Sequence, residues 1–239
     1  MDTPKRTIWI QALKVAFPHT IPILAGFTFL GIAYGIFMHS LGFHAMYPFI
    51  ISMVVFAGSM EFITANLLLG AFNPVYAFFL TIMVNARHLF YGISLLDTYK
   101  GIGKKKWYMI FGLCDESFAI NQSIDVPKNV DKGLVMFFVT ILNQIYWVVG
   151  ATIGGVFGYL ITFNTEGLEF VMTALFVVIF IEQWMKEDRH VSSLVGIAAS
   201  VVCLLLFGKG AFIIPAMIAI LGILTLARKP LEKGRVSVQ

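Results

Sequence analysis

The sequence predicts an all-α polytopic integral membrane protein. Of its 239 residues, 59% are hydrophobic and only 13% are charged, against roughly 25% charged residues in an average soluble domain. The hydrophobic residues form long segments, and a helix of about 20 apolar residues spans the roughly 30 Å of bilayer hydrocarbon. Most Lys and Arg residues lie between these segments. They therefore orient the chain in the lipid bilayer and do not indicate a nucleic-acid partner.

Seven hydrophobic segments are predicted to cross the membrane. Before the first of them, residues 7–17 mix aliphatic and aromatic residues with a lysine, which suits a helix lying in the membrane interface. The predicted spans cover residues 20–38, 46–69, 74–96, 133–163, 167–185, 191–207 and 211–227. The second and third spans are joined by a five-residue hinge over residues 70–74.

Glycines at G-x-x-x-G spacing occur in the first and fourth spans, at Gly31, Gly35, Gly150, Gly154 and Gly158. This spacing lets two helix backbones approach closely. We therefore expect these faces to pack against another helix. That helix could belong to a partner subunit.

The number of spans depends on residues 107–124, a half-apolar segment after the third span. If it does not cross, there are seven helices, with 12 Lys and Arg on one side of the membrane and 4 on the other. If it crosses, there are eight helices and the counts become 11 and 5. The positive-inside rule separates these alternatives weakly. We favour seven, because eight places the lysines at 104–106 outside; in both, the C-terminus is cytoplasmic.

The spans are predicted to form a single transmembrane domain with an internal repeat. Residues 17–96 and 133–207 hold three helices each, and an offset of 121 places Glu61 over Glu182. With seven helices the two units are inverted, a plan that places a transporter's site at their interface. Residues 97–132 form a basic linker with a half-polar helix. The last helix and a basic tail follow over residues 208–239.

Polar residues inside the second and third spans are the candidate substrate-binding residues: Ser59, Glu61, Asn66, Asn85 and Arg87. A charge at the centre of a span costs about 2.5 to 3.5 kcal/mol, so such residues usually pair or face a cavity. Glu61 lies 11 residues before the hinge at Phe72 and Arg87 lies 15 after it. The two side chains can therefore reach each other, either as a structural ion pair or in a substrate site.

Helix geometry divides the polar residues of the third span into two groups. Asn85 and His88 share a helix face, whereas Arg87 points about 160 to 200° away from them. We expect one group to face a cavity and the other to contact a neighbouring helix. His88, Asp115 and Glu116 are the candidates for coupling or gating. His88 titrates near neutral pH, but a neutral core histidine is equally compatible, and the two acids could also form a solvated linker face.

The sequence contains no signature of an enzyme, a metal centre or a cofactor site. The motifs H-E-x-x-H, G-x-S-x-G and the P-loop are missing, and the five histidines do not have metal-ligand spacing. We therefore expect a non-enzyme without metal or cofactor. A membrane enzyme and a non-transporting assembly subunit remain the alternative classes.

Three stretches resemble the azaleucine-resistance, or AzlC-type, permease family, the large subunits of branched-chain amino acid exporters. They are residues 57–62 (AGSMEF), 85–92 (NARHLFYG) and 115–119 (DESFA). The resemblance covers the whole chain, and the Asn-x-Arg-His block is its most specific part. Relatives often carry Gln at the position of Glu61, which puts an obligatory Glu61–Arg87 ion pair in doubt.

The resemblance implies a secondary transporter in the bacterial cytoplasmic (inner) membrane. It would export leucine, isoleucine, valine and similar aliphatic amino acids, together with a small hydrophobic membrane subunit of the AzlD type. Export against a gradient implies coupling, for which protons are the expected ion. An aliphatic zwitterion needs a cation for its carboxylate, an acid or carbonyls for its ammonium group, and an apolar pocket. Arg87, and Glu61 with Ser59, are the expected partners.

Overall fold

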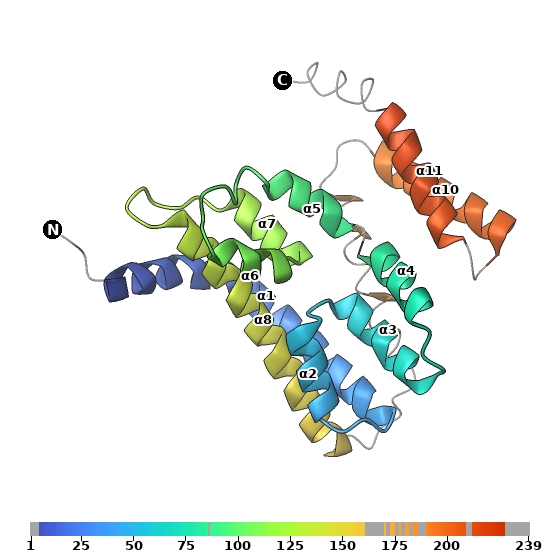
Figure 1. The fold of residues 1–239 in the computed structure, drawn as a ribbon, viewed down its shortest axis with the longest axis horizontal. Helices are drawn as coiled ribbons and strands as arrows, with labels where there is room; N and C mark the ends of the chain where they lie inside the picture. The colour runs from blue at the N-terminus through green and yellow to red at the C-terminus, as the bar shows by residue number, and fades with distance from the viewer. Residues whose placement is uncertain are drawn as a thin grey trace. The chain divides into compact units, whose positions relative to one another are not determined.

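The computed structural model describes residues 5–85, 87–160, 190–208 and 212–227, together with 170, 173–174, 177, 180–181 and 184–185. All regular structure in these residues is helical (Figure 1), in agreement with the predicted all-α class. The chain divides into two compact units, Met1–Met172 and Thr173–Gln239. These two units do not correspond to the two predicted repeats, residues 17–96 and 133–207, which stay a prediction.

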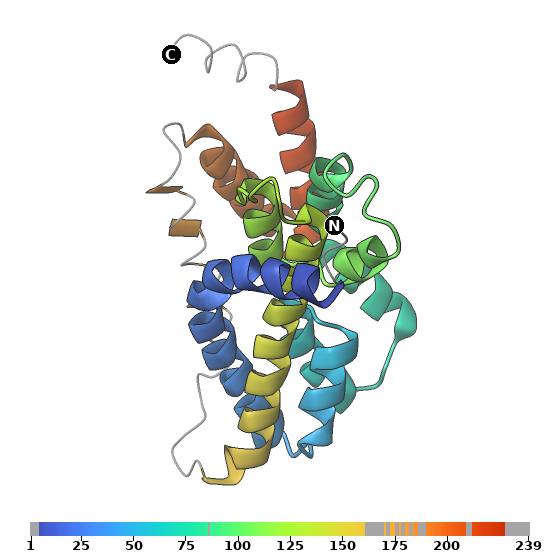
Figure 2. The ribbon, with the colours of Figure 1, turned by 90° about the vertical axis from the view of Figure 1, so that its left-hand side faces the viewer.

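The first unit is built on α1 (Lys5–Ser40) and α8 (Lys132–Phe157), which make the most extensive helix contact in the described part of the chain (Figure 2). The 3₁₀ turn η1 (Gly158–Leu160) continues α8. Helix α1 contains Pro18 and Pro22 and is visibly bent. Proline removes a backbone hydrogen bond and kinks a helix. The predicted interfacial segment and the first span are thus parts of one helix.

The glycines of α1 and α8 pack against each other. A Cβ atom on Gly35 would lie 2.2 Å from the carbonyl oxygen of Ala151, and one on Gly154 would lie 2.1 Å from that of Ile32. Both distances are too short for any residue but glycine. The expected close packing is confirmed, but these faces are filled from within the chain. They do not supply the open surface that would accept a partner helix.

The predicted span 46–69 is interrupted, contrary to expectation. Helix α2 (Met46–Val54) ends before Phe56, whose φ of 43° is left-handed, and α3 (Gly58–Leu69) begins two residues later. A non-glycine residue in this region is rare and costs free energy, so the surrounding structure must hold the break in place. Apolar length predicted the segment but not its interruption.

The predicted span 74–96 is likewise two helices, α4 (Pro74–Val84) and α5 (Arg87–Leu95), whose axes differ by 53°. The hinge before α4 is where the sequence predicts it. There the side chain of Asn73 accepts hydrogen bonds from the backbone N–H groups of Val75 and Tyr76 at 3.0 and 3.1 Å. These bonds satisfy donors that a helix N-terminus leaves unpaired.

The half-apolar segment forms two short helices, α6 (Lys105–Phe111) and α7 (Asp115–Ser123), both packed against α8. Cys114 and Ser117 cap α7 reciprocally: the Cys114 N–H donates to the Ser117 hydroxyl at 2.9 Å, and the Ser117 N–H donates to the Cys114 sulfur at 3.5 Å. Neither helix is long enough to cross a bilayer. Because both helices contact α8, the segment lies against the bundle.

Two helices in the described residues are long and apolar enough to cross a membrane, Arg6–Ser40 and Lys132–Leu160, and a third span results if the bent pair α4 and α5 is counted as one. In the second unit, α10 (Val191–Phe207) packs against α11 (Ile213–Leu226). Glu182 and most of the predicted span 167–185 lie outside the described residues. The seven spans and the inverted repeat therefore stay predictions.

Candidate functional site

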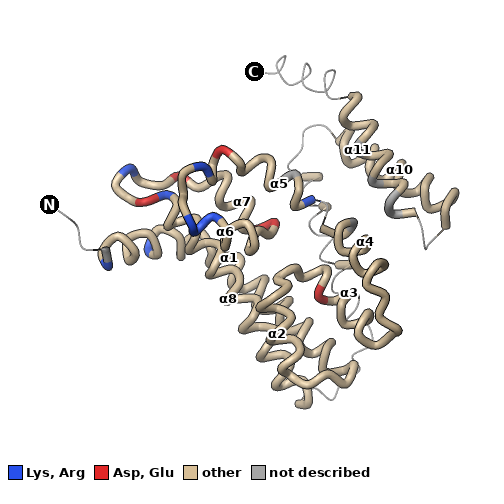
Figure 3. Tube along the Cα trace, in the orientation of Figure 1, with Lys and Arg blue, Asp and Glu red and all other residues tan. Residues whose placement is uncertain are grey.

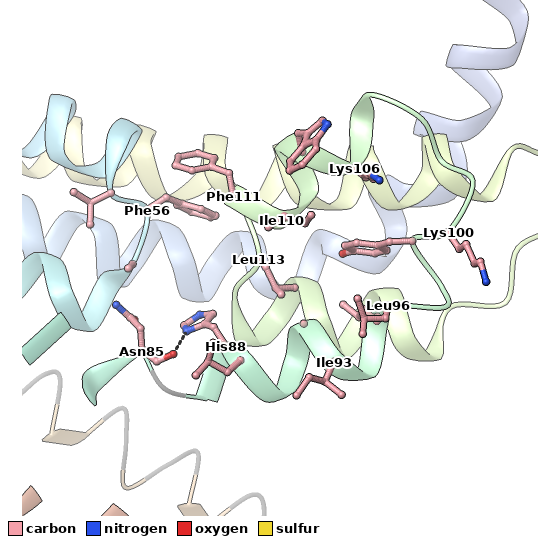
Figure 4. A pocket seen from close by; sticks show the side chains of 17 residues that line it. Phe56, Asn85, His88, Ile93, Leu96, Lys100, Lys106, Ile110, Phe111 and Leu113 are labelled. Carbon is pink, nitrogen blue, oxygen red and sulfur yellow. Dashed lines mark hydrogen bonds between the residues drawn. The ribbon is translucent and has the colours of Figure 1, made fainter. Parts of the chain in front are cut away.

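Three helix interruptions line one cavity in the first unit. The cavity has a volume of about 720 Å³ and contacts the break between α2 and α3 at Phe56, the break between α4 and α5 at Asn85, and the break between α6 and α7 at Leu113 (Figure 4). Ligand sites commonly have volumes of about 300 to 1,000 Å³. Interrupted backbone inside a membrane protein is tolerated where it lines a cavity, and in many transporters it forms the substrate site.

The walls of the cavity are largely apolar, and its polar groups lie at its two ends. Asn85 and His88 lie at one end, and Lys100 and Lys106 at the other (Figure 4). Between them are aliphatic and aromatic side chains, which include Leu89, Ile93, Leu96, Tyr99, Ile110 and Phe111. An apolar body with a polar group at one end would match this arrangement.

The first turns of three helices meet beside the cavity. Arg87, the first residue of α5, forms an ion pair of 2.8 Å with Asp115, the first residue of α7. Arg87 Nη2 also donates to the hydroxyl of Ser59, in the first turn of α3, at 3.4 Å. Helix N-termini carry partial positive charge and unpaired N–H donors. Together with Arg87 they stabilise the carboxylate of Asp115, which lies among them.

Glu61 contacts Trp147, and not Arg87 as the sequence suggested. Its carboxylate is fully buried and accepts hydrogen bonds from Trp147 Nε1, 2.9 Å from each oxygen, and from the Ala57 N–H at 3.1 Å. Ser59 and Glu61 are two residues apart and so point about 200° apart on α3. Because Ser59 faces α5, Glu61 faces α8. Glu61 thus stabilises the break before α3.

The third span divides as expected, although the helix on which the expectation rested is broken between α4 and α5. Asn85 and His88 line the cavity, whereas Arg87 contacts α7. The Nδ1 atom of His88 lies 3.1 Å from the Asn85 carbonyl oxygen, so this nitrogen donates and the histidine is tied to the break. The rings of His88 and Tyr91 lie edge to face at 5.6 Å, and Tyr91 stacks on Phe118 of α7 at 4.3 Å.

Asp115 and Glu116 are both half-buried at the start of α7, which is not one of the candidate membrane spans. Asp115 is paired with Arg87. Burial raises the pKa of Glu116 to about 7, and the negative charge of Asp115 acts in the same direction. A carboxyl group with this pKa exchanges a proton near neutral pH, as the coupling hypothesis requires.

The structure brings Ser59, Asn85, Arg87, His88 and Asp115 together but leaves Asn66 apart. Asn66 is exposed, two turns after Ser59 on α3, and does not line the cavity. Its role in substrate binding stays a prediction. In the part of the chain that the structure describes, no three His, Cys, Asp or Glu side chains lie close enough together to hold a metal ion.

Sequence reasoning missed Trp147, Lys100 and Lys106 as parts of the site. In the sequence, Trp147 is one of many apolar residues of a long predicted span. The two lysines were interpreted only as charges that orient the chain in the membrane. The interruptions themselves had one signal in the sequence: Gly58 and Asn85 lie in the middle of predicted continuous spans, and Gly112 lies shortly before Asp115. Residues of these types are poor in helix interiors.

Comparison with known proteins supports this picture of a membrane protein. Residues 22–161 match the family described as "AzlC protein". A Bacillus subtilis (strain 168) protein named "Branched-chain amino acid transport protein AzlC" is 70% identical over 231 residues, which cover 97% of this chain and 91% of that protein.

More distant relatives match over a similar length. An "Uncharacterized membrane protein" of Haemophilus influenzae is 49% identical, with 93% of this chain and 91% of that protein covered. One of Helicobacter pylori (strain J99) is 35% identical, with 94% and 98% covered. No solved structure matches the chain significantly.

Proposed function

Because the chain belongs to the AzlC family, we propose that it is a secondary transporter that exports branched-chain aliphatic amino acids such as leucine, isoleucine and valine. The substrate class follows the printed name of the Bacillus subtilis relative, which is 70% identical. The direction of transport follows the family resemblance of the sequence. The observation that carries the proposal is the convergence of three helix interruptions on one largely apolar cavity of about 720 Å³.

The Arg87–Asp115 ion pair offers the two charges that a zwitterion needs. When the pair separates, Arg87 can bind the substrate carboxylate and Asp115 its ammonium group, while the cavity holds the aliphatic side chain. Two charges of opposite sign are then exchanged for two others, so no unpaired charge remains in the low-dielectric interior. Arg87 suits this role because its planar guanidinium can bind a carboxylate with two parallel hydrogen bonds.

Export against a gradient requires coupling, and we assign it to protons. Glu116 is the favoured carrier because its pKa of about 7 lies near physiological pH and because it adjoins Asp115. We also propose that a small hydrophobic subunit of the AzlD type is required. Exposed apolar side chains of the described helices could contact such a subunit, whereas the glycine faces of α1 and α8 are already packed.

A cavity-filling substitution tests the proposal. Gly92 lines the cavity, and no atom lies within 4 Å of the position of an added Cβ atom. Gly92→Leu should therefore enter the cavity without a backbone clash and abolish leucine efflux from preloaded cells that also express the small subunit. Gly26→Leu is the matched control, because Gly26 has equal space around it and does not line the cavity.

Wild-type efflux from the Gly92→Leu variant would contradict this location of the site. Absence of leucine, isoleucine and valine efflux from the wild-type protein, with its partner present, would contradict the proposed function itself. Equal abundance of both variants in the membrane must be checked by immunoblot, so that loss of transport is not loss of protein.

A further inference from the structure

The described charged residues that line the cavity are all basic and lie at one end of it. Lys100 and Lys106 line one end, and no Asp or Glu is among the described residues that line it. The neighbouring Lys105 points its charge elsewhere, with Nζ 3.8 Å from Asp131. Lys106 Nζ lies 5.4 Å from the ring centroid of Trp107, a contact that leaves its positive charge in place. The lysine end of the cavity therefore favours an anion, and Figure 3 shows Lys and Arg positions in blue around α6.

Apolar walls strengthen this preference. A cleft with one sign of charge and low-dielectric walls focuses the field and raises the local concentration of counter-ions. An ammonium group at the lysine end of the cavity would meet two positive charges and no acid among the described lining residues, and charges of the same sign repel each other. An aliphatic carboxylate would place its charge at the lysines and its hydrocarbon between Ile93, Leu96 and Ile110 (Figure 4).

The opposite end offers neutral hydrogen-bonding groups. Asn85 has an amide side chain that can donate to a carbonyl oxygen, and His88 lies beside it. Neither side chain is an acid, so this end offers no partner for a positive charge. A 2-oxo group is bonded to the carboxylate carbon and therefore stays beside the carboxylate at the lysine end.

We propose that the cavity is also a binding site for short branched aliphatic carboxylates without an ammonium group, including 2-oxo acids, with the carboxylate at Lys100 and Lys106. This ligand leaves the Arg87–Asp115 ion pair closed, whereas the zwitterion of the proposed function separates it. The role of the cavity in transport rests on that proposed function. The site gives the chain a ligand class that differs from amino acids by one charge.

Calorimetric titration of the purified full-length protein in detergent micelles tests the site without a transport step. The probes are 4-methyl-2-oxopentanoate, 4-methylpentanoate and 3-methylbutylamine, which share a branched carbon chain and differ in charge. We expect both carboxylates to bind, the amine not to bind, and raised salt concentration to weaken the carboxylates. Empty micelles measure partition into detergent.

The double variant K100Q/K106Q, which removes both positive charges, should bind the carboxylates at least tenfold more weakly. Binding should persist in K100R/K106R, which keeps both charges, and in K128Q, which removes a lysine that does not line the cavity. Equal affinity of wild type and K100Q/K106Q, or equal binding of the amine and the carboxylates, would overturn the proposal. Absence of carboxylate binding to the wild type would also overturn it.

The two proposals fail separately. Leucine efflux with no carboxylate binding would leave the transporter in place and remove this site. Carboxylate binding with no efflux of any branched-chain amino acid would keep the site and remove the proposed function.

Discussion

Arg87 and Asp115 join the first residues of two short helices, α5 and α7, through an ion pair of 2.8 Å. The residues are 28 positions apart and belong to two of the three interrupted segments. Ser59, in the third, accepts a further hydrogen bond from Arg87. One side chain thus contacts residues beside all three interruptions.

We predict that leucine efflux requires Arg87 itself and not merely a cation. Arg87→Lys and Arg87→Ala should both reach the membrane and lose efflux, because lysine lacks the planar fork that binds a carboxylate and an aspartate at once. Efflux from preloaded cells is the measurement. Near-normal transport by the Ala variant would remove Arg87 from the mechanism.

The ion pair should also be measurable as a coupling in stability. Arg87→Ala and Asp115→Ala each leave a half-buried charge without this partner, so the double substitution should cost less than the sum of the two. A coupling of about 0.5 to 3 kcal/mol is expected for residues in direct contact. The double-mutant cycle is measured from the free energies of unfolding of the four proteins in detergent. If the two losses of stability simply add, the contact contributes nothing.

Glu61 is predicted to act through its hydrogen bonds and not through its charge. Glu61→Gln keeps an oxygen that can accept from Trp147 Nε1, so it should stay near wild type in stability. Trp147→Phe leaves the buried carboxylate with only the Ala57 N–H among its described donors, and we expect a loss of about 1 to 3 kcal/mol.

The same Trp147→Phe change should cost less in the Glu61→Gln background, since the amide has one oxygen that can accept from Trp147 Nε1, where the carboxyl group has two. Thermal unfolding of the four proteins measures this. An equal loss in both backgrounds would mean that Trp147 acts by packing alone, through its contacts with Phe27 and Tyr34.

The glycine contact between α1 and α8 gives a prediction with a matched control. Gly35→Ala places a Cβ atom 2.2 Å from a backbone oxygen and should destabilise the protein by about 1 to 3 kcal/mol. Gly26→Ala, on the same helix with open space around it, should leave the melting temperature unchanged or raise it slightly. Similar melting temperatures for both variants would contradict the contact.

Glu116 is predicted to give efflux its pH dependence. Because its pKa is raised to about 7, the side chain is largely protonated at pH 6 and largely ionised at pH 8. Glu116→Gln cannot change charge, so its efflux should vary less over this range than that of the wild type. Exchange of internal for external leucine should remain. Asp125→Asn, at an exposed acid beyond α7, is the control.

If efflux by Glu116→Gln depends on pH as in the wild type, Glu116 does not carry the coupling proton and its role is structural. The charges beside Glu116 are Asp115 and, more distantly, Arg87. Asp115→Asn should therefore be measured in parallel, because loss of its charge lowers the pKa of Glu116 and shifts the profile to lower pH.

The sequence by itself determined the class of the protein and the stretches that carry its polar residues. Apolar length and sparse charge predict membrane helices because hydrocarbon excludes unpaired polar groups. The hinge before α4 was predicted because Gly70, Asn73 and Pro74 are poor in helix interiors. The helix period also predicted that Asn85 and His88 would part from Arg87. They do so, but the break between α4 and α5, and not a continuous helix, positions Asn85.

Only the tertiary structure decided the partners. Glu61 and Arg87 have matching depths, but depth does not determine the direction in which a side chain points, and Ser59 takes the face of α3 that Arg87 reaches. The partner of Glu61 is Trp147, 86 residues away. Its choice depends on how α3 packs against α8, and a left-handed residue such as Phe56 is stable only because neighbouring helices hold it. Such contacts arise from the packed bundle and have no local signal in the sequence.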